Sequence, residues 1–198
     1  TKKSDGVRQL ENQRKKIQEE IKRISALLTQ TTSSSKNTLQ RISLLDQQIR
    51  ARKEAIATMQ SEVTALNGQI DELEVQLDSL QVRFDHKQVS YIKSIRALQT
   101  HHSTEDMLMF VLSAKDFAEG MRRAEYLGQY AKWQRDQAEK LKALRAEIEA
   151  QRAELERARD KQQQLLNDKT AEQTKLQADQ DAARQEASRL KGKEKELR

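Results

Sequence analysis

The chain has 198 residues with no cysteine and no proline, and charged residues make up 34% of it against 4% aromatic residues. This composition is typical of coiled coils and long helices. It excludes a large globular core, because the thinly spread aliphatic residues suffice only for a narrow helical seam. The net charge of +6 arises from interspersed residues of both signs, which indicates a solvated helix surface rather than a nucleic-acid site.

Residues 5–99 carry a sevenfold apolar repeat that predicts one long coiled-coil helix. Alternating steps of four and three residues visit 26 positions, and 19 of these are apolar or aromatic. Such strict spacing favours a left-handed supercoil with a partner helix. Thr31, Ser35 and Thr38 are three consecutive polar core positions, and such residues suit a helix interior poorly. We expect an unbroken but softer helix there, with a hinge as the alternative.

A chemically distinct tip is predicted over residues 100–133. All seven aromatic residues of the chain fall between Phe84 and Trp133. The first helix is expected to end near Thr100. After it, Ser103 stands as a capping residue ahead of the apolar run 107–112, which predicts a short helix.

A second long helix is predicted over residues 114–198. Ser113 can cap it, and Asp116 at its third position can reach back to the backbone. From Leu141 onward it carries a weaker heptad frame. A connection of about 14 residues between two long helices returns the second one alongside the first. The predicted fold is therefore all-α, an elongated antiparallel two-helix coiled-coil hairpin with a short helical tip.

No catalytic, metal or cofactor site is expected. His102 and Asp106, with His101 beside them, match one metal-ligand spacing, but a second ligand element is missing because the only other histidine is His86. The glycines are scattered singly, which argues against a phosphate-binding loop, and a two-helix rod offers no enclosed pocket to activate a side chain. We expect no enzyme, no small-molecule substrate and no cofactor. The longest apolar run, 107–112, is far shorter than the roughly 20 residues that a membrane-spanning helix needs.

The apolar and aromatic residues of the tip have two possible roles. They can fill a small cap core, or part of the cluster can be exposed and bind a protein partner, since aromatic residues and methionine are enriched at such interfaces. Both roles can hold at once. The candidate partner-binding residues are Met107, Leu108, Phe110, Val111, Phe117, Met121, Tyr126, Leu127, Tyr130 and Trp133.

Residues 107–135 resemble a pattern in the coiled-coil region of the EnvC family of murein hydrolase activators. In that family a hydrophobic turn is followed by Leu-Ser-Ala, an aromatic residue, paired arginines and Tyr-Leu-x-x-Tyr. The matching residues here are Leu112-Ser113-Ala114, Phe117, Arg122-Arg123, Tyr126-Leu127 and Tyr130. The flanking heptads agree with the family but also with many other coiled coils.

The resemblance implies a periplasmic or extracytoplasmic role in cell division. In the EnvC family the helical hairpin is recruited by the extracytoplasmic loop of the membrane protein FtsX, and a C-terminal LytM-like domain then activates amidases that split peptidoglycan. We expect this chain to be the recruiting and regulatory part alone, without the LytM-like domain and without a signal peptide. Any link to the amidases is then indirect.

Two other functions stay open. The chain can be a structural spacer or an oligomerising coiled coil without a specific tip ligand. It can also be a helical arm that binds RNA through basic residues such as Lys15, Lys16, Lys22 and Arg23, with salt-dependent affinity. We rank RNA binding last and expect no nucleic acid as a partner.

Overall fold

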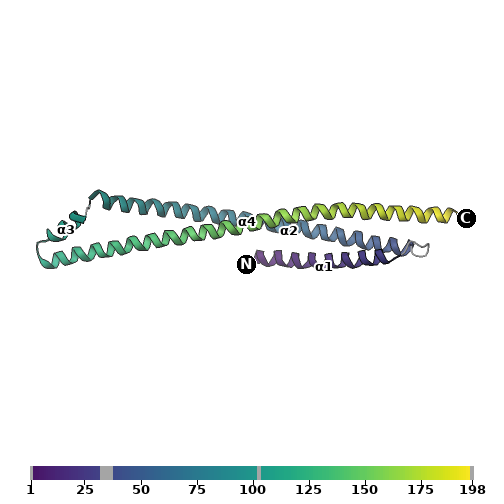
Figure 1. The fold of residues 1–198 in the computed structure, drawn as a ribbon, viewed down its shortest axis with the longest axis horizontal. Coiled ribbons are helices and arrows are strands. Elements are labelled where there is room, and N and C mark those ends of the chain that lie inside the picture. Colours follow the sequence, from purple (N-terminus) through teal and green to yellow (C-terminus); the bar gives the residue numbers. More distant parts are fainter. Residues whose placement is uncertain (1, 32–37, 102–103, 197–198) are drawn as a thin grey trace. The chain divides into compact units, whose positions relative to one another are not determined.

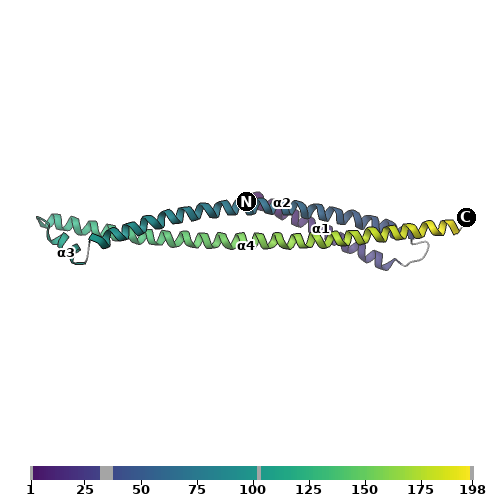
Figure 2. The same cartoon turned by 90° about the horizontal axis from the view of Figure 1, so that it is seen from above.

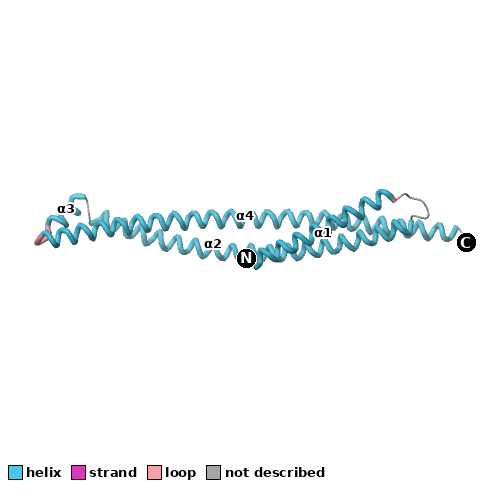
Figure 3. The backbone as a smooth tube through the Cα atoms, turned by 90° about the horizontal axis from the view of Figure 1, so that it is seen from below, coloured by secondary structure: helices cyan, strands magenta, loops and turns pink. Residues whose placement is uncertain are grey.

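The computed structural model describes residues 2–31, 38–101 and 104–196, and these ranges are helical apart from short turns. Four helices follow one another: α1 (Lys2–Gln30), α2 (Thr38–His101), α3 (Thr104–Leu112) and α4 (Phe117–Glu196) (Figure 1). Within the described ranges no strand occurs, so the prediction of an all-α fold is confirmed. Figure 3 shows how a short loop between α3 and α4 interrupts the helical trace.

The helices form two compact units. Unit 1 comprises Thr1–Glu72 and Glu156–Arg198, and unit 2 comprises Leu73–Leu155. Unit 1 therefore contains α1, the first part of α2 and the last part of α4. Unit 2 contains the rest of α2, the whole of α3 and the first part of α4.

In unit 1, α1 folds back along α2, so the prediction of one unbroken helix over residues 5–99 is wrong. Arg14 Nε donates to Glu62 Oε1 at 2.9 Å, and Gln48 Nε2 donates to Ser25 Oγ at 2.9 Å. Residue numbers rise along α1 as they fall along α2, so these helices are antiparallel. In one straight helix the two pairs would lie about 70 and 35 Å apart. Three helices therefore pack in unit 1, where two were expected (Figures 1 and 2).

α1 ends at Gln30 and α2 begins at Thr38, and the two helices run in opposite directions instead of forming one softer helix. Ser35, the middle one of the polar core positions, lies outside the described residues. Thr31 Oγ1 donates to the Leu27 carbonyl at 2.7 Å, and hydroxyls that bond back in this way compete with the helix ladder. Across the turn, Arg41 Nη1 donates to the Thr31 carbonyl at 2.9 Å. This bond satisfies a carbonyl that the end of α1 leaves open.

The sevenfold frame buries its apolar residues as expected, but α2 also buries a second face. Ile17 and Ile21 of α1 pack on Ala51 and Ala55 of α2 in one cluster. The alanines lie outside the predicted frame, and their small side chains allow α1 to approach closely. A second cluster joins Met59, Val63 and Leu66 of α2 to Leu165 of α4 and Val7 of α1.

Opposite charges at core positions fix the register of α2 against α4 in unit 1. On α4, Glu172, Asp179 and Glu186 follow one another at intervals of seven residues. Arg52 of α2 binds the first two, with its Nη1 2.5 Å from Glu172 Oε2 and its Nε 2.5 Å from Asp179 Oδ2. Arg41 Nε lies 3.2 Å from Glu186 Oε1. Buried pairs of this kind select one alignment because a lone buried charge is strongly unfavourable.

In unit 2, α2 and α4 run antiparallel as a pair. Gln151 Nε2 donates to Gln76 Oε1 at 2.7 Å, and the Tyr130 hydroxyl donates to the Ser94 carbonyl at 3.2 Å. The residue numbers of the partners thus change in opposite directions. The core of this pair contains Leu77, Leu80, Phe84, Leu144 and Ile148.

Around the tip, one helix end differs from the prediction. α2 ends at His101 and α3 follows as the predicted short helix, while its expected cap, Ser103, lies outside the described residues. α4 begins at Phe117 rather than near Ala114. The reason is that Asp116, not Ser113, caps this helix: its Oδ1 accepts the Glu119 amide at 2.7 Å.

Candidate protein-interaction site

The tip of unit 2 carries a short helix, α3, that is apolar on two sides. On α3, Met107, Phe110 and Val111 are half-buried, and their spacing of three and four residues places them on one face. The other side of α3 is apolar as well but exposed. Its residues, with their exposed fractions, are Leu108 (59%), Met109 (65%) and Leu112 (75%).

Arg123 of α4 holds the end of α3 in place. Its Nη1 donates to the Phe110 carbonyl at 2.6 Å and to Ser113 Oγ at 3.0 Å, and its guanidinium carbon lies 4.7 Å from the centre of the Phe110 ring. The Phe110 carbonyl is one of the last four of α3, which have no partner within the helix. A cation at this end also complements the helix dipole. Because nine residues are too few for a stable isolated helix, α3 depends on this anchor.

The first turn of α4 completes the anchor through Glu119. Its Oε2 accepts the Lys115 amide at 3.0 Å, and its Oε1 accepts Arg123 Nη2 at 2.6 Å. The hydrogen bond from the Lys115 amide has the largest effect and the one from Arg123 the next largest, and together they lower the pKa of Glu119 below its ordinary value. Glu119 therefore stays ionised at neutral pH and orients the arginine side chain towards α3.

An open, mostly apolar groove lies between α3 and α4. Its volume is about 520 Å³, and Asp116 is the one ionisable residue in its lining. Phe117 and Met121 flank it with exposed fractions of 83% and 57%. The remaining lining residues are Val111, Leu112, Ala114, Gly120 and Ala124.

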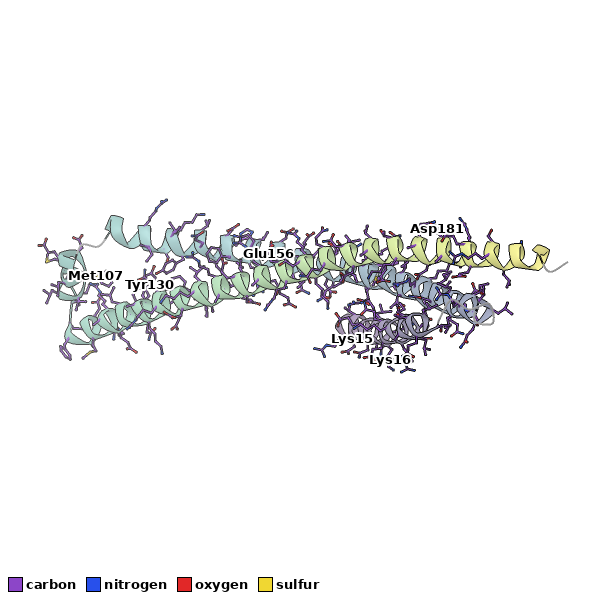
Figure 4. All side chains as sticks on the ribbon, turned by 45° about the vertical axis from the view of Figure 1, so that its right-hand side comes forward. Lys15, Lys16, Met107, Tyr130, Glu156 and Asp181 are labelled. Carbon is purple, nitrogen blue, oxygen red and sulfur yellow. The ribbon has the colours of Figure 1, made fainter. Side chains whose placement is uncertain are left out.

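The ten predicted tip residues divide evenly between exposed and half-buried positions. Exposed are Leu108, Phe117, Met121, Tyr126 and Trp133, and half-buried are Met107, Phe110, Val111, Leu127 and Tyr130. Figure 4 labels Met107 on α3 and Tyr130 on α4.

One aromatic residue, Tyr130, links α4 to α2. The Tyr130 hydroxyl bonds to the Ser94 carbonyl of α2, and the Tyr130 and Trp133 rings lie 5.6 Å apart with a tilt of 32°. Tyr126 is 63% exposed on α4. The structure thus brings Phe117 and Met121 together with α3, and it gives Tyr130 a contact with α2.

Sequence reasoning missed several residues that build the site. Met109 and Leu112 are exposed beside the groove, yet only other members of the apolar run were selected as partner-binding residues. Sorting the residues of α3 by their position around the helix would have distinguished its two apolar sides. Arg123 belongs to the paired arginines of the family pattern, but that pattern does not show that Arg123 contacts α3. Glu119 has no comparable signal, because a charged residue on a helix is most often solvated.

The described part of the chain shows no candidate metal site. Among those residues, no group of three or more histidine or carboxylate side chains could hold a metal ion. His102, one member of the histidine–aspartate spacing noted in the sequence, lies outside the described residues. None of the described helices is long and apolar enough to cross a membrane.

The basic residues considered for RNA binding lie on α1. Lys15, Lys16, Lys22 and Arg23 are all exposed, and Figure 4 labels the first two. Glu19 and Glu20 are exposed on the same helix. The mixture of signs is that of a solvated helix surface.

Comparisons with known proteins add no assignment. No family model, curated protein or solved structure matches this chain.

Proposed function

We propose that this chain is the non-catalytic recruitment and regulatory region of an EnvC-like murein hydrolase activator. In this proposal the tip binds the extracytoplasmic loop of FtsX, and the protein acts in the periplasm during cell division. Amidases are reached only through a further LytM-like domain. The support comes from the residue pattern at 107–135 and from the exposed apolar surface that the same residues form.

The single observation that carries the proposal is the concentration of exposed apolar side chains at the tip. Leu108, Met109, Leu112, Phe117 and Met121 are all more than half exposed. They flank or adjoin one groove, whereas most other residues in the chain's apolar seams are buried. Exposed apolar patches on an otherwise polar protein commonly mark interaction sites.

The chemistry of the surface describes the partner that fits it. The groove is lined mostly by methyl, methylene and ring groups, so the partner segment should present apolar side chains to it. Methionine and phenylalanine adapt their shape to such a segment. Arg122 is exposed next to the anchoring arginine and is available to a carboxylate at the rim.

A link from the tip to the rest of the chain follows from helix continuity. α2 and α4 each run without interruption from unit 2 into unit 1. If binding of the partner moves α3 relative to α4, the first turns of α4 are the next part of the chain to be displaced. In the proposal, this connection makes the region regulatory as well as recruiting.

Titration of the purified FtsX loop into this chain tests the proposal. Leu112→Glu and Phe117→Glu place a charge on exposed positions, so helicity should stay unchanged while affinity falls at least about tenfold, since burying an unpaired charge is unfavourable. Phe110 and Tyr130 suit this test less well, because each has a contact within the tip. Leu39→Glu is the matched control, because Leu39 is 65% exposed on α2 in unit 1. Equal binding by all four proteins refutes the tip assignment.

A structural observation also favours the oligomerising coiled coil as a second candidate. On α2 in unit 2, Val75, Val82 and Val89 are 69%, 55% and 52% exposed and follow one another at intervals of seven residues. A stripe of this kind can pack against another helix. Sedimentation of the chain between about 5 and 200 µM decides: a monomer throughout opposes this function, and a dimer that Val82→Glu disrupts supports it.

A further inference from the structure

The face of α2 that α1 covers is made largely of small and polar side chains. Ala51 and Ala55 contact α1 in the Ile17–Ile21 cluster, and Gln48 and Glu62 form hydrogen bonds with it. The seam between α2 and α4 is different. It is filled by Met59, Val63, Leu66 and Leu165, with Val7 of α1 beside them.

This contrast means that α2 and α4 do not need α1 in order to stay paired. On α2, removing α1 exposes only alanine methyl groups and polar side chains, so the α2–α4 pair loses little free energy. Most of the cost of release falls on α1, whose buried Val7, Ile17, Ile21 and Ile24 become exposed. The larger aliphatic side chains between α2 and α4 keep one another as partners. The Arg52 pairs with Glu172 and Asp179 also join α2 to α4 and do not involve α1.

The contact of α1 with the rest of unit 1 is interrupted by an open pocket. This pocket of about 460 Å³ lies between α1, α2 and α4. Three of its lining residues, Gln18, Lys22 and Ser25, are polar residues of α1, and Arg52 and Glu172 line the opposite side. Because the pocket is open to water, α1 makes fewer packing contacts there than a close-packed interface would have.

A buried carboxylate lies beneath α1. Glu62 is fully buried, its Oε1 accepts Arg14 Nε at 2.9 Å, and its Oε2 has no hydrogen-bond partner among the described residues. The charged groups that face it are Arg14 and Glu11 from α1 and Lys161 from α4. A buried oxygen without a partner costs about 1–3 kcal/mol, and undocking of α1 restores it to water.

From this geometry we infer that α1 is a releasable helix, which leaves the α2–α4 pair as one unit and returns to it, with Glu62 setting the balance between the two states. Released α1 loses the tertiary packing from which a helix in a protein gains most of its stability. Release therefore appears as cooperative opening of α1 backbone amides. The inference concerns unit 1 and is independent of the function proposed for the tip.

The direction of the pH dependence follows from the burial of Glu62. Burial raises the pKa of Glu62 above its ordinary value of 4.5 even though Arg14 acts in the opposite direction. The neutral carboxyl therefore favours docking, and this contribution is fully present below pH 4.5. It is lost as the pH rises through the raised value. α1 should thus be held least tightly at neutral pH.

Hydrogen exchange of the full chain, corrected for intrinsic rates, tests the inference. The proteins are the wild type, Glu62→Gln and the control Glu54→Gln, which changes an exposed glutamate of the same helix. At pH 7 the α1 amides should exchange together and faster than those of residues 59–66. Glu62→Gln should raise α1 protection by about tenfold, because it removes the charge of a buried group, and Glu54→Gln should leave it unchanged. In the wild type, lowering the pH from 7 to about 4.5 should raise the protection of the α1 amides by the same factor. In Glu62→Gln the same change of pH should not raise it.

Two results overturn the inference. If α1 and residues 59–66 share one protection level, the three helices of unit 1 open together and α1 is not separately releasable. If α1 opens alone but Glu62→Gln leaves its protection unchanged or lowers it, Glu62 does not set the balance.

Discussion

Replacing Arg123 by alanine should release α3 from α4 while leaving the rest of unit 2 folded. The side chain donates to the Phe110 carbonyl at 2.6 Å and lies over the Phe110 ring at 4.7 Å. A hydrogen bond from a charged group contributes about 1.5 kcal/mol at a partly exposed site. A cation–π contact adds about 0.5–1 kcal/mol. The loss of about 2 kcal/mol corresponds to a change of roughly 30-fold in the docking equilibrium of α3.

Hydrogen exchange at α3 measures this change, with Arg122→Ala as the matched control. Arg122 is the neighbouring arginine and is exposed. In Arg123→Ala the protection of residues 105–112 should fall by about an order of magnitude, while residues 77–84 keep theirs. Arg123→Lys should be nearly as damaging, because lysine keeps the charge but not the planar fork. Unchanged α3 protection in Arg123→Ala, or an equal fall in Arg122→Ala, would refute the role given to this side chain.

Three further predictions concern the stability of the units, measured by urea unfolding. Leu165→Ala should destabilise unit 1 by about 3 kcal/mol, since it empties a buried position, whereas Val75→Ala at an exposed position should stay within about 0.5 kcal/mol; equal effects would contradict the core described here. Gly120→Ala should stabilise the start of α4 by about 0.5–1 kcal/mol, because alanine favours a helix more than glycine does. The added Cβ has room, since it meets the Val111 carbonyl at 3.5 Å, an ordinary contact distance. A loss of stability would show that α3 lies closer to α4 than described. Burial raises the pKa of Glu172, but hydrogen bonds from Lys175 and Arg52 outweigh it and leave the pKa below the ordinary 4.5. The ionised carboxylate of Glu172 therefore contributes to stability above pH 4.5, and this contribution is lost as the pH falls through the lowered pKa. If the loss of stability in acid is as large in Glu172→Gln as in the wild type, this reasoning is contradicted.

Much of the fold could be predicted from the sequence because one physical signal dominates it. The sevenfold spacing identifies Met59, Val63 and Leu66 as core residues, and all three are buried. The frame fails to show which helix covers which face. The second buried face of α2 contains Gln48 and Ala51, and small or polar residues at helical spacing give no hydrophobic signal.

The reversal after α1 could be recognised only in part. The polar positions around Thr31 and Thr38 marked a weak place, and a weak place permits either a soft helix or a turn. The choice depends on tertiary contacts, such as the bond from Arg41 to the Thr31 carbonyl and the contacts between α1 and α2. Such contacts override local preference, and no pattern within the stretch encodes them.

At the tip, composition located the exposed apolar cluster but not its architecture. The aromatic residues and the apolar run correctly placed the exposed apolar cluster between the two long helices. The anchor built from Arg123 and Glu119 depends on the direction of individual side chains. Charged residues occur at every third position of this chain on average, as their share of 34% implies. The paired arginines of the family pattern include Arg123, but no sequence pattern shows which of the two contacts α3 or that Glu119 orients it.

The most direct test of the account is the hydrogen-exchange footprint of the purified FtsX loop on this chain. The account predicts added protection at residues 105–121, where α3, the groove and the start of α4 lie, with residues 5–30 of α1 unchanged. Protection confined to unit 1, or none at saturating concentration of the loop, would contradict the central claim that the apolar tip is the recruiting surface.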